Sequence, residues 1–259
     1  IIKMIKQIFY VLGINLIGSF WRISILFESQ NADHVKENCL NHELILPPLW
    51  YNRFVDKQNL AKSEFGKTFP DKLKSGDEVR IITPSRSLAI ITPESRKIAN
   101  ERFEKLGLKL SFGKHIEEMD DFASSSIESR VEDLHQAFRD KNIKAILTVI
   151  GGFNSNQLLR YVDWNLIKEN PKIFCGYSDI TALNNAILTK TGLVTYSGPH
   201  YSNFGQKLYF DYTLDYFKKC LFSDDPFEVK PSESWSDDTW YKNQDDRKLI
   251  LHKGWLPIN

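Results

Sequence analysis

One serine of the chain occupies a position at which a nucleophile could act. Ser178 lies in the sequence Gly-Tyr-Ser-Asp, between the apolar run 172–175 and the helix-like segment 179–189. A turn from a strand into a helix exposes a side-chain oxygen at the sheet edge, and the first N–H groups of the helix can bind a developing oxyanion. The pattern predicts Ser178 as a nucleophile and the backbone N–H of Asp179 as an oxyanion donor. A second interpretation stays open, in which Ser178 is only the N-cap of the helix, because the full G-x-S-x-G pattern is absent.

Two other loops carry residues suited to an oxyanion or an anionic group. Gly151 and Gly152 follow the apolar run 145–150, and their backbone can approach an oxyanion because no Cβ is in the way. Ser85 follows the run 78–83 and offers a hydroxyl. Turn roles stay open for all three residues, and the glycines match neither G-x-G-x-x-G nor a P-loop. Because ligands of open α/β sheets bind outside the carboxyl ends of the strands, we expect these loops to share one site.

The elements that must position these loops follow from the pattern of apolar residues. Short β-branched runs alternate with amphipathic stretches from Lys72 onward, as in βαβ units around a mostly parallel sheet. The expected strands are residues 78–83, 108–112, 145–150, 172–175 and 194–196. The expected helices are residues 93–106, 129–139, 156–164 and 179–189. We therefore predict an α/β fold of the flavodoxin or Rossmann kind, with helices on both faces of a mostly parallel sheet.

Composition excludes several classes of protein. The 259 residues contain 34 Lys and Arg against 33 Asp and Glu, a formal charge of +1, which argues against binding nucleic acid through a basic surface. The three cysteines, Cys39, Cys175 and Cys220, are widely spaced and form no C-x-x-C pair, so neither a disulfide framework nor a zinc ribbon is predicted. We expect no metal, no cofactor and a reducing, cytoplasmic location.

The first seventy residues differ in character from the rest. Residues 8–21 are apolar apart from Asn15 and Ser19 and follow two lysines, but the run is short for a membrane span and no clear cleavage site follows it. A signal or anchor and a buried or artefactual segment both stay open. Membrane association is not expected except through this run.

Five segments carry a family resemblance, in the same order along the chain. They are KLKSGDEVRIITPSRS, LTVIGGFNSNQLL, IFCGYSDITALNNAI, TYSGPHYSNFG and FKKCLFSDDPFEVKPSESWSDDTWY. Together they resemble the LD-carboxypeptidase family of serine peptidases, and within it the branch of MccF-like microcin C self-immunity proteins. The similarity covers about residues 72–259.

The resemblance implies an amide hydrolase with a Ser-Glu-His triad. Ser178 matches the family's nucleophile, and the backbone N–H groups of Asp179 and Gly152 match its oxyanion hole. The glutamate and the histidine cannot be mapped, because in the family both come from the carboxyl-terminal half. The implied domains are an N-terminal extension of doubtful status (1–70), an α/β nucleophile domain (71–205), and a linker with the beginning of a truncated catalytic domain (206–259).

Substrate contacts are expected from five residues. Ser85, Gly151 and His200 lie in the family's motifs, although His200 does not match the base. Trp235 and Trp240 lie in the polar stretch 222–246 and could stack on a nucleobase, a contact worth roughly 1–3 kcal/mol. The alternatives are loop packing for His200 and packing of both indoles onto the body of the protein.

Three functions stay open on the sequence. The first is a homodimeric immunity protein that cleaves microcin C-like peptidyl-nucleotides, which is what the resemblance favours. The second is a murein tetrapeptide LD-carboxypeptidase. The third is an inactive, truncated α/β binding protein. In each, the expected partner is a small peptide or peptidyl-nucleotide rather than nucleic acid.

Overall fold

The computed structural model describes residues 12–17, 20–25 and 66–251. The chain divides into two units, Ile1–Gln58 and Asn59–Asn259. Within the described residues, no helix has the length and apolarity needed to cross a membrane.

The described part of the first unit is a pair of strands. β1 (Leu12–Ile17) and β2 (Phe20–Ile25) pair in antiparallel fashion. They overlap the apolar run 8–21, of which residues 8–11 and 18–19 lie outside the described residues.

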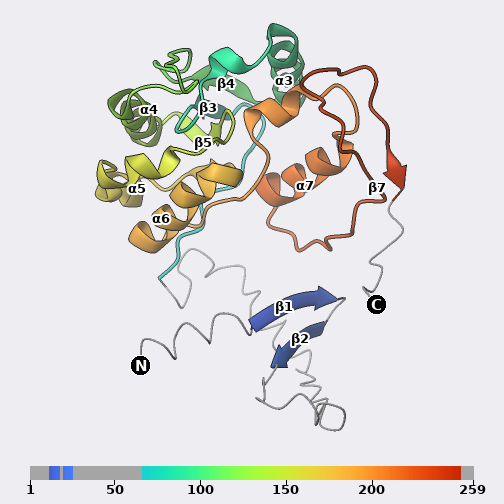
Figure 1. The fold of residues 1–259 in the computed structure, drawn as a ribbon. Coiled ribbons are helices and arrows are strands. Elements are labelled where there is room, and N and C mark those ends of the chain that lie inside the picture. Colours follow the sequence, from blue (N-terminus) through green and yellow to red (C-terminus); the bar gives the residue numbers. More distant parts are fainter. Residues whose placement is uncertain (1–11, 18–19, 26–65, 252–259) are drawn as a thin grey trace, which may run out of the picture. The chain divides into compact units, whose positions relative to one another are not determined.

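A parallel sheet forms the centre of the second unit (Figure 1). Its strands are β3 (Glu78–Ile82), β4 (Lys109–Phe112), β5 (Ile143–Thr148) and β6 (Ile173–Cys175). They lie in the order β4-β3-β5-β6, and all three pairings are parallel. The chain therefore runs outward in both directions from the β3–β5 pair, which is the switch point where ligands of this fold class bind. The predicted α/β fold is confirmed.

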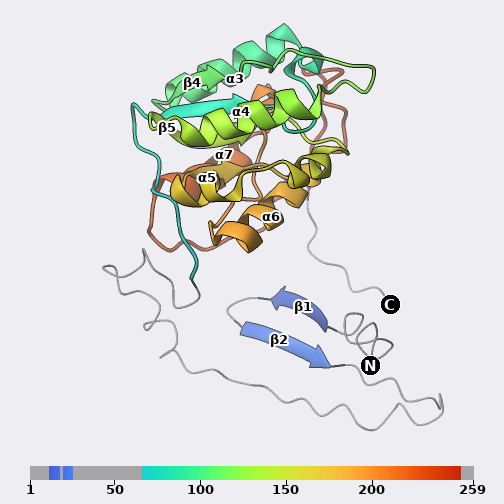
Figure 2. The same cartoon turned by 90° about the vertical axis from the view of Figure 1, so that its left-hand side faces the viewer.

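Helices cover both faces of this sheet, as Figures 1 and 2 show. Two buried clusters correspond to the two faces. The helices are α3 (Pro93–Lys105) and α7 (Asp211–Phe222) on one face, and α4 (Ile127–Arg139), α5 (Trp164–Glu169) and α6 (Thr181–Thr191) on the other. Strand residues alternate between the clusters: Ile173 and Cys175 face α3 and α7, whereas Phe174 faces α4 to α6.

Two expected elements were wrong. The helix expected at 156–164 is a 3₁₀ helix, Ser155–Arg160, and α5 begins separately at Trp164. The break has a local cause, because the Asp163 side chain accepts a hydrogen bond from the Leu166 N–H at 3.0 Å and so caps a new helix. The strand expected at 194–196 is reduced to one parallel bridge between Cys175 and Tyr196.

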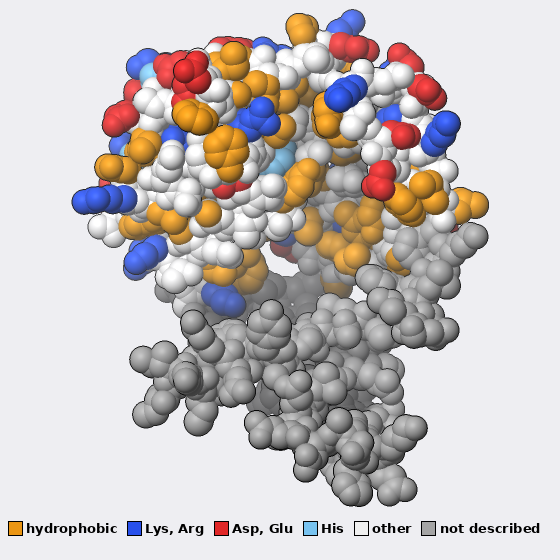
Figure 3. Space-filling model, viewed as in Figure 1, with side chains coloured by type: hydrophobic (Ala, Val, Ile, Leu, Met, Phe, Trp, Pro, Cys, Tyr) orange, Lys and Arg blue, Asp and Glu red, His pale blue; other side chains and the backbone are white. Residues whose placement is uncertain are grey.

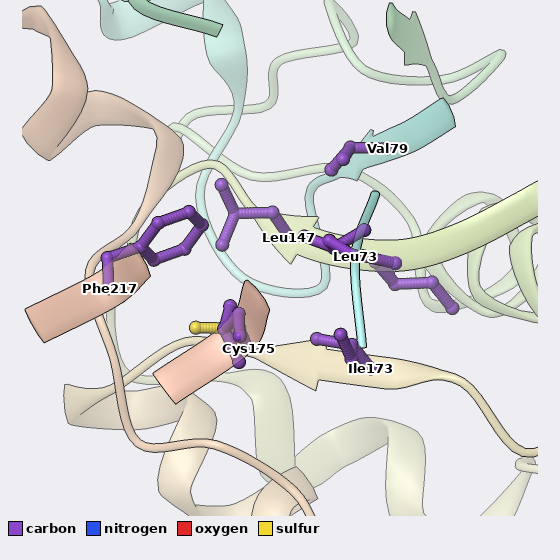
Figure 4. Close-up of a pocket in the computed structure, with 9 residues that line it drawn as sticks. Leu73, Val79, Leu147, Ile173, Cys175 and Phe217 are labelled. Atoms are coloured by element: carbon purple, nitrogen blue, oxygen red, sulfur yellow. The ribbon is translucent and has the colours of Figure 1, made fainter. Parts of the chain in front are cut away.

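Helix α7 was not predicted, yet it packs on the sheet. Phe217 and Leu221 are buried in the same cluster as Val79 of β3 and Leu147 of β5. A small cavity of about 10 Å³ remains where α7 meets the strands, and all of its lining is apolar apart from the thiol of Cys175 (Figure 4). A space of this size has no room for a substrate and is a packing defect of the core.

Charges of both signs are interspersed over the face shown in Figure 3. This distribution agrees with the formal charge of +1 and shows no continuous basic track on that face.

Candidate active site

Ser178 sits at a sharp turn between strand and helix. β6 ends at Cys175, and a 3₁₀ turn, Ser178–Ile180, leads directly into α6. The φ angle of Ser178 is +59°, a left-handed conformation that is uncommon for a residue other than glycine. The side chain is exposed, and no described side chain hydrogen-bonds its Oγ. The strained turn therefore presents a free hydroxyl at the carboxyl edge of the sheet.

The turn is held against the neighbouring strand. A Cβ built on Gly176 would lie 2.3 Å from Oγ1 of Thr148, so only glycine lets the chain pass β5 this closely. The Asn184 side chain, on α6, donates to the Gly176 carbonyl at 2.8 Å. Together these contacts fix where the chain turns before Ser178.

The carboxylate of Asp179 joins three loops, which follow β3, β5 and β6. Its Oδ2 accepts hydrogen bonds from Ser85 Oγ at 2.7 Å, from the Asn154 N–H at 3.0 Å and from the Ser155 N–H at 2.9 Å. In return, Ser155 Oγ donates to the Asp179 carbonyl at 2.7 Å. The loops expected to share one site do so through this side chain.

A second group of buried polar residues supports the same loops. Ser124 Oγ donates to the Ser85 carbonyl at 2.6 Å and accepts from the Asn154 side-chain amide at 2.9 Å. Arg130, 2% exposed, donates to the carbonyls of Pro84 and Asn154 at 3.3 and 3.1 Å. Burial lowers the pKa of its guanidinium from the usual value.

Gly151 and Gly152 lie close to the nucleophile turn. A Cβ on Gly151 would lie 3.0 Å from Ser178 Cβ, 3.2 Å from its Oγ and 3.4 Å from the Asp179 nitrogen. A Cβ on Gly152 would lie 2.3 Å from Ser85 Oγ. No described acceptor takes a hydrogen bond from the Gly152 N–H, and Asp179 lies in the first helical turn, where N–H groups have no acceptor within the helix. Both N–H groups are therefore available to an oxyanion beside Ser178.

His200 lies behind the turn rather than in the open site. It is 2% exposed, its Nδ1 is 2.7 Å from Thr148 Oγ1, and its ring stacks on Tyr177 at 4.3 Å between centroids. Its Nε2 is buried and makes no hydrogen bond within the described residues. Burial lowers its pKa to about 4, so the imidazole is neutral at pH 7.

Residues 79–198 match the sequence model of the LD-carboxypeptidase N-terminal domain. The chain belongs to the LD-carboxypeptidase family. It is 55% identical over 186 residues to "Putative carboxypeptidase YocD" of Bacillus subtilis strain 168, which is 72% of this chain and 57% of that protein.

Solved structures of this family have the same fold. An MccF-like protein from Bacillus anthracis str. Ames is 62% identical with a TM-score of 0.71, over 72% of this chain and 57% of that one. Microcin C7 self immunity protein MccF in complex with aspartyl sulfamoyl adenosine is 31% identical with a TM-score of 0.66, over 71% and 57%. The chain therefore spans little more than half the length of these LD-carboxypeptidase relatives.

The two tryptophans expected to contact the substrate have partners close to them in the sequence. Trp235 pairs with Ile250 between β7 (Ser234–Trp235) and β8 (Ile250–Leu251), and Trp240 stacks edge-on against Tyr241. Among the described residues, neither indole forms a hydrogen bond or ring contact with the loops around Ser178. Within the residues that the structure describes, no group of three or more His, Cys, Asp or Glu is placed to hold a metal.

Sequence reasoning missed three residues that hold the site, namely Ser124, Arg130 and Asn154. Asn154 lies in a loop that was singled out only for its glycines. Arg130 offered a usable signal, because it occupies a helical segment beside the apolar positions Val131 and Leu134. A cation near the buried side of a helix needs acceptors, and here these are loop carbonyls.

We expect Asp179→Ala to destabilise the fold. The substitution leaves the Asn154 and Ser155 N–H groups without their acceptor, which costs about 1–3 kcal/mol for each buried group left unpaired, whereas the Ser85 hydroxyl keeps Asn154 Oδ1 as an acceptor at 3.1 Å. Urea unfolding measures the loss, with Asp237→Ala at an exposed position as the control. Equal stability of the two variants would contradict the joining role of Asp179.

The depressed pKa of His200 predicts a stability that falls on acidification. An unfolded histidine takes up its proton near pH 6.5, whereas the folded one does so only near pH 4. Between these values the unfolded state binds more protons, so the free energy of unfolding decreases by up to about 3 kcal/mol as pH falls. Urea titrations of the wild type from pH 7 to 4 should show this decrease, and His200→Asn should show a flatter profile. An unchanged profile in the variant would assign the pH dependence elsewhere.

Proposed function

We propose that this chain carries the nucleophile and oxyanion hole of a serine-type amide hydrolase. One observation carries the proposal: Ser178 presents an exposed hydroxyl at a left-handed turn, with the free N–H of Gly152 and the N–H of Asp179 in adjacent loops. Membership of the LD-carboxypeptidase family supports it.

The proposed reaction proceeds through an acyl-enzyme. Ser178 Oγ attacks the amide carbonyl while a base takes its proton, and the two N–H groups bind the oxyanion that forms. Collapse of this intermediate expels the amine, which takes the proton, and water then hydrolyses the ester on Ser178. The family resemblance implies a histidine base oriented by a glutamate. His200 does not meet this role, because it is buried and its Nδ1 is bonded to Thr148.

We propose a peptidyl-nucleotide of the microcin C kind as substrate. The 62% identity to an MccF-like protein supports this branch, and the related MccF has been solved with an aminoacyl sulfamoyl adenosine. Murein tetrapeptide cleavage is the second candidate, and the LD-carboxypeptidase description of the matched domain favours it. A cytoplasmic location and a homodimeric state stay predictions from the sequence.

Ser178 should react selectively with a fluorophosphonate probe. We expect labelling at Ser178 in the folded protein that also carries the base, found by mass spectrometry of tryptic peptides, because the base activates the hydroxyl and the oxyanion hole stabilises the adduct. Ser178→Ala should abolish labelling, and Ser223→Ala should not. Absence of an adduct at Ser178, or equal labelling of heat-denatured chain, would overturn the assignment of the nucleophile.

Two substrates distinguish the candidate functions. Incubation of the protein that also carries the base with a peptidyl-adenylate analogue should release free peptide, at a kcat/KM about tenfold or more above D-alanine release from a murein tetrapeptide. Liquid chromatography with mass detection follows both products, and Ser178→Ala supplies the blank. The reverse preference would assign the chain to murein cleavage, and turnover that survives Ser178→Ala would reject both.

A further inference from the structure

Arg86 lies beside the proposed oxyanion loop with no protein partner for its charge. A Cβ built on Gly152 would lie 2.8 Å from Arg86 Cγ and 3.2 Å from its Cδ, so the stem of the side chain passes directly over this glycine. Its Nε is buried and has no hydrogen-bond partner within the described residues. No carboxylate of the described residues forms an ion pair with the Arg86 guanidinium.

The lack of a protein acceptor distinguishes Arg86 from the other buried or half-buried arginines. Within residues 66–251, every other arginine that is buried or half-buried donates to at least one protein oxygen. They are Arg80, Arg96, Arg102, Arg130 and Arg247. A guanidinium has five N–H donors in a rigid fork, and leaving a buried donor unpaired is unfavourable. Arg86 therefore has hydrogen-bonding capacity that the described protein does not use.

The backbone around Arg86 is held firmly. Ser85 on one side bonds Asp179, and Ser87 on the other donates to the Ile116 carbonyl and accepts from the Ala89 N–H. Both serines are almost fully buried. With its neighbours fixed, the side chain of Arg86 loses less entropy on binding a ligand than it would in a mobile loop.

Both candidate substrates carry an anion next to the leaving nitrogen. In a murein tetrapeptide, the D-alanine that leaves has its carboxylate one carbon away from the amide nitrogen. In a peptidyl-nucleotide joined through an N-acyl phosphoramidate, the amide nitrogen is bonded directly to a phosphoryl group with a charged oxygen. Arginine is the side chain best suited to bind carboxylate or phosphoryl oxygens in bidentate fashion.

We propose that Arg86 binds the anionic group on the leaving side of the scissile amide, and so determines specificity for substrates with a charge there. The inference rests on the proposed function, because the leaving group is defined by attack of Ser178. It adds a recognition residue in the loop after β3, which neither the motif comparison nor the hydrogen bonds of the site assign.

Binding measurements test this role separately from the reaction. We would use the chain with Ser178→Ala, so that ligands stay intact, and titrate two matched pairs by calorimetry. The first pair is a murein tetrapeptide ending in D-alanine and the same peptide ending in D-alaninamide. The second pair is AMP and adenosine. The pair with the larger preference for its charged member identifies carboxylate or phosphate as the natural anion.

We expect the charged member of at least one pair to bind roughly 10-fold to 100-fold more tightly, as a charge-assisted hydrogen bond would give. Adding Arg86→Gln should reduce this ratio to about one, and Arg86→Lys, which keeps the charge without the fork, should restore part of it. Arg160→Gln removes an equal charge from an exposed position and should leave the ratio unchanged. Thermal unfolding of each variant verifies that it is folded.

Two results would overturn the proposal. One is a preference that persists in the Arg86→Gln variant, and the other is the absence of any preference in the chain that retains Arg86. Neither result affects the nucleophile, because fluorophosphonate labelling at Ser178 is measured independently. If Ser178 is labelled and either of these results is found, the proposed hydrolase function stands and only the role of Arg86 is rejected.

Discussion

The geometry of the site depends on one carboxylate. Asp179 follows the nucleophile directly, and its side chain points back into the protein to accept three hydrogen bonds from the loops after β3 and β5. Hydrogen bonds to an ionised acceptor are shorter and stronger than neutral ones. The carboxylate thus fixes its own backbone N–H, and with it the position of Ser178, relative to Gly152. A residue whose backbone is proposed to bind the oxyanion also assembles the site through its side chain.

The sheet order explains why one side chain can reach three loops. β3, β5 and β6 are neighbours and parallel, so their carboxyl ends meet at the same edge. Parallel strands lie about 4.8 Å apart, which is within reach of a carboxylate and a loop amide together. The close approach of Gly176 to Thr148 then fixes the position of the turn that precedes Ser178 relative to β5. The switch point of the fold and the hydrogen bonds of Asp179 locate the site at the same place.

Sequence reasoning predicted that the three loops of the candidate site lie together, but not the contacts among them. Strand ends are readable because apolar runs stop at Gly or Pro, so Ser85, Gly152 and Ser178 could be singled out and placed on one edge. The side-chain role of Asp179 could not be predicted, because it depends on which strands are neighbours. His200 was expected near the substrate, and its burial against Thr148 has no periodic signal in the sequence. The 3₁₀ segment was missed because a short turn of helix resembles a loop, whereas α7 was missed although Leu214, Phe217 and Leu221 repeat at helical spacing.

The left-handed backbone at Ser178 restricts which residues evolution can place there. At a positive φ, a second heavy atom on Cβ clashes with the backbone, so a β-branched side chain is strongly disfavoured. Threonine, although it carries the same hydroxyl, is therefore disfavoured at this turn, whereas serine and cysteine fit. At the nucleophile of this fold, exchange of oxygen for sulfur costs less backbone strain than exchange of serine for threonine.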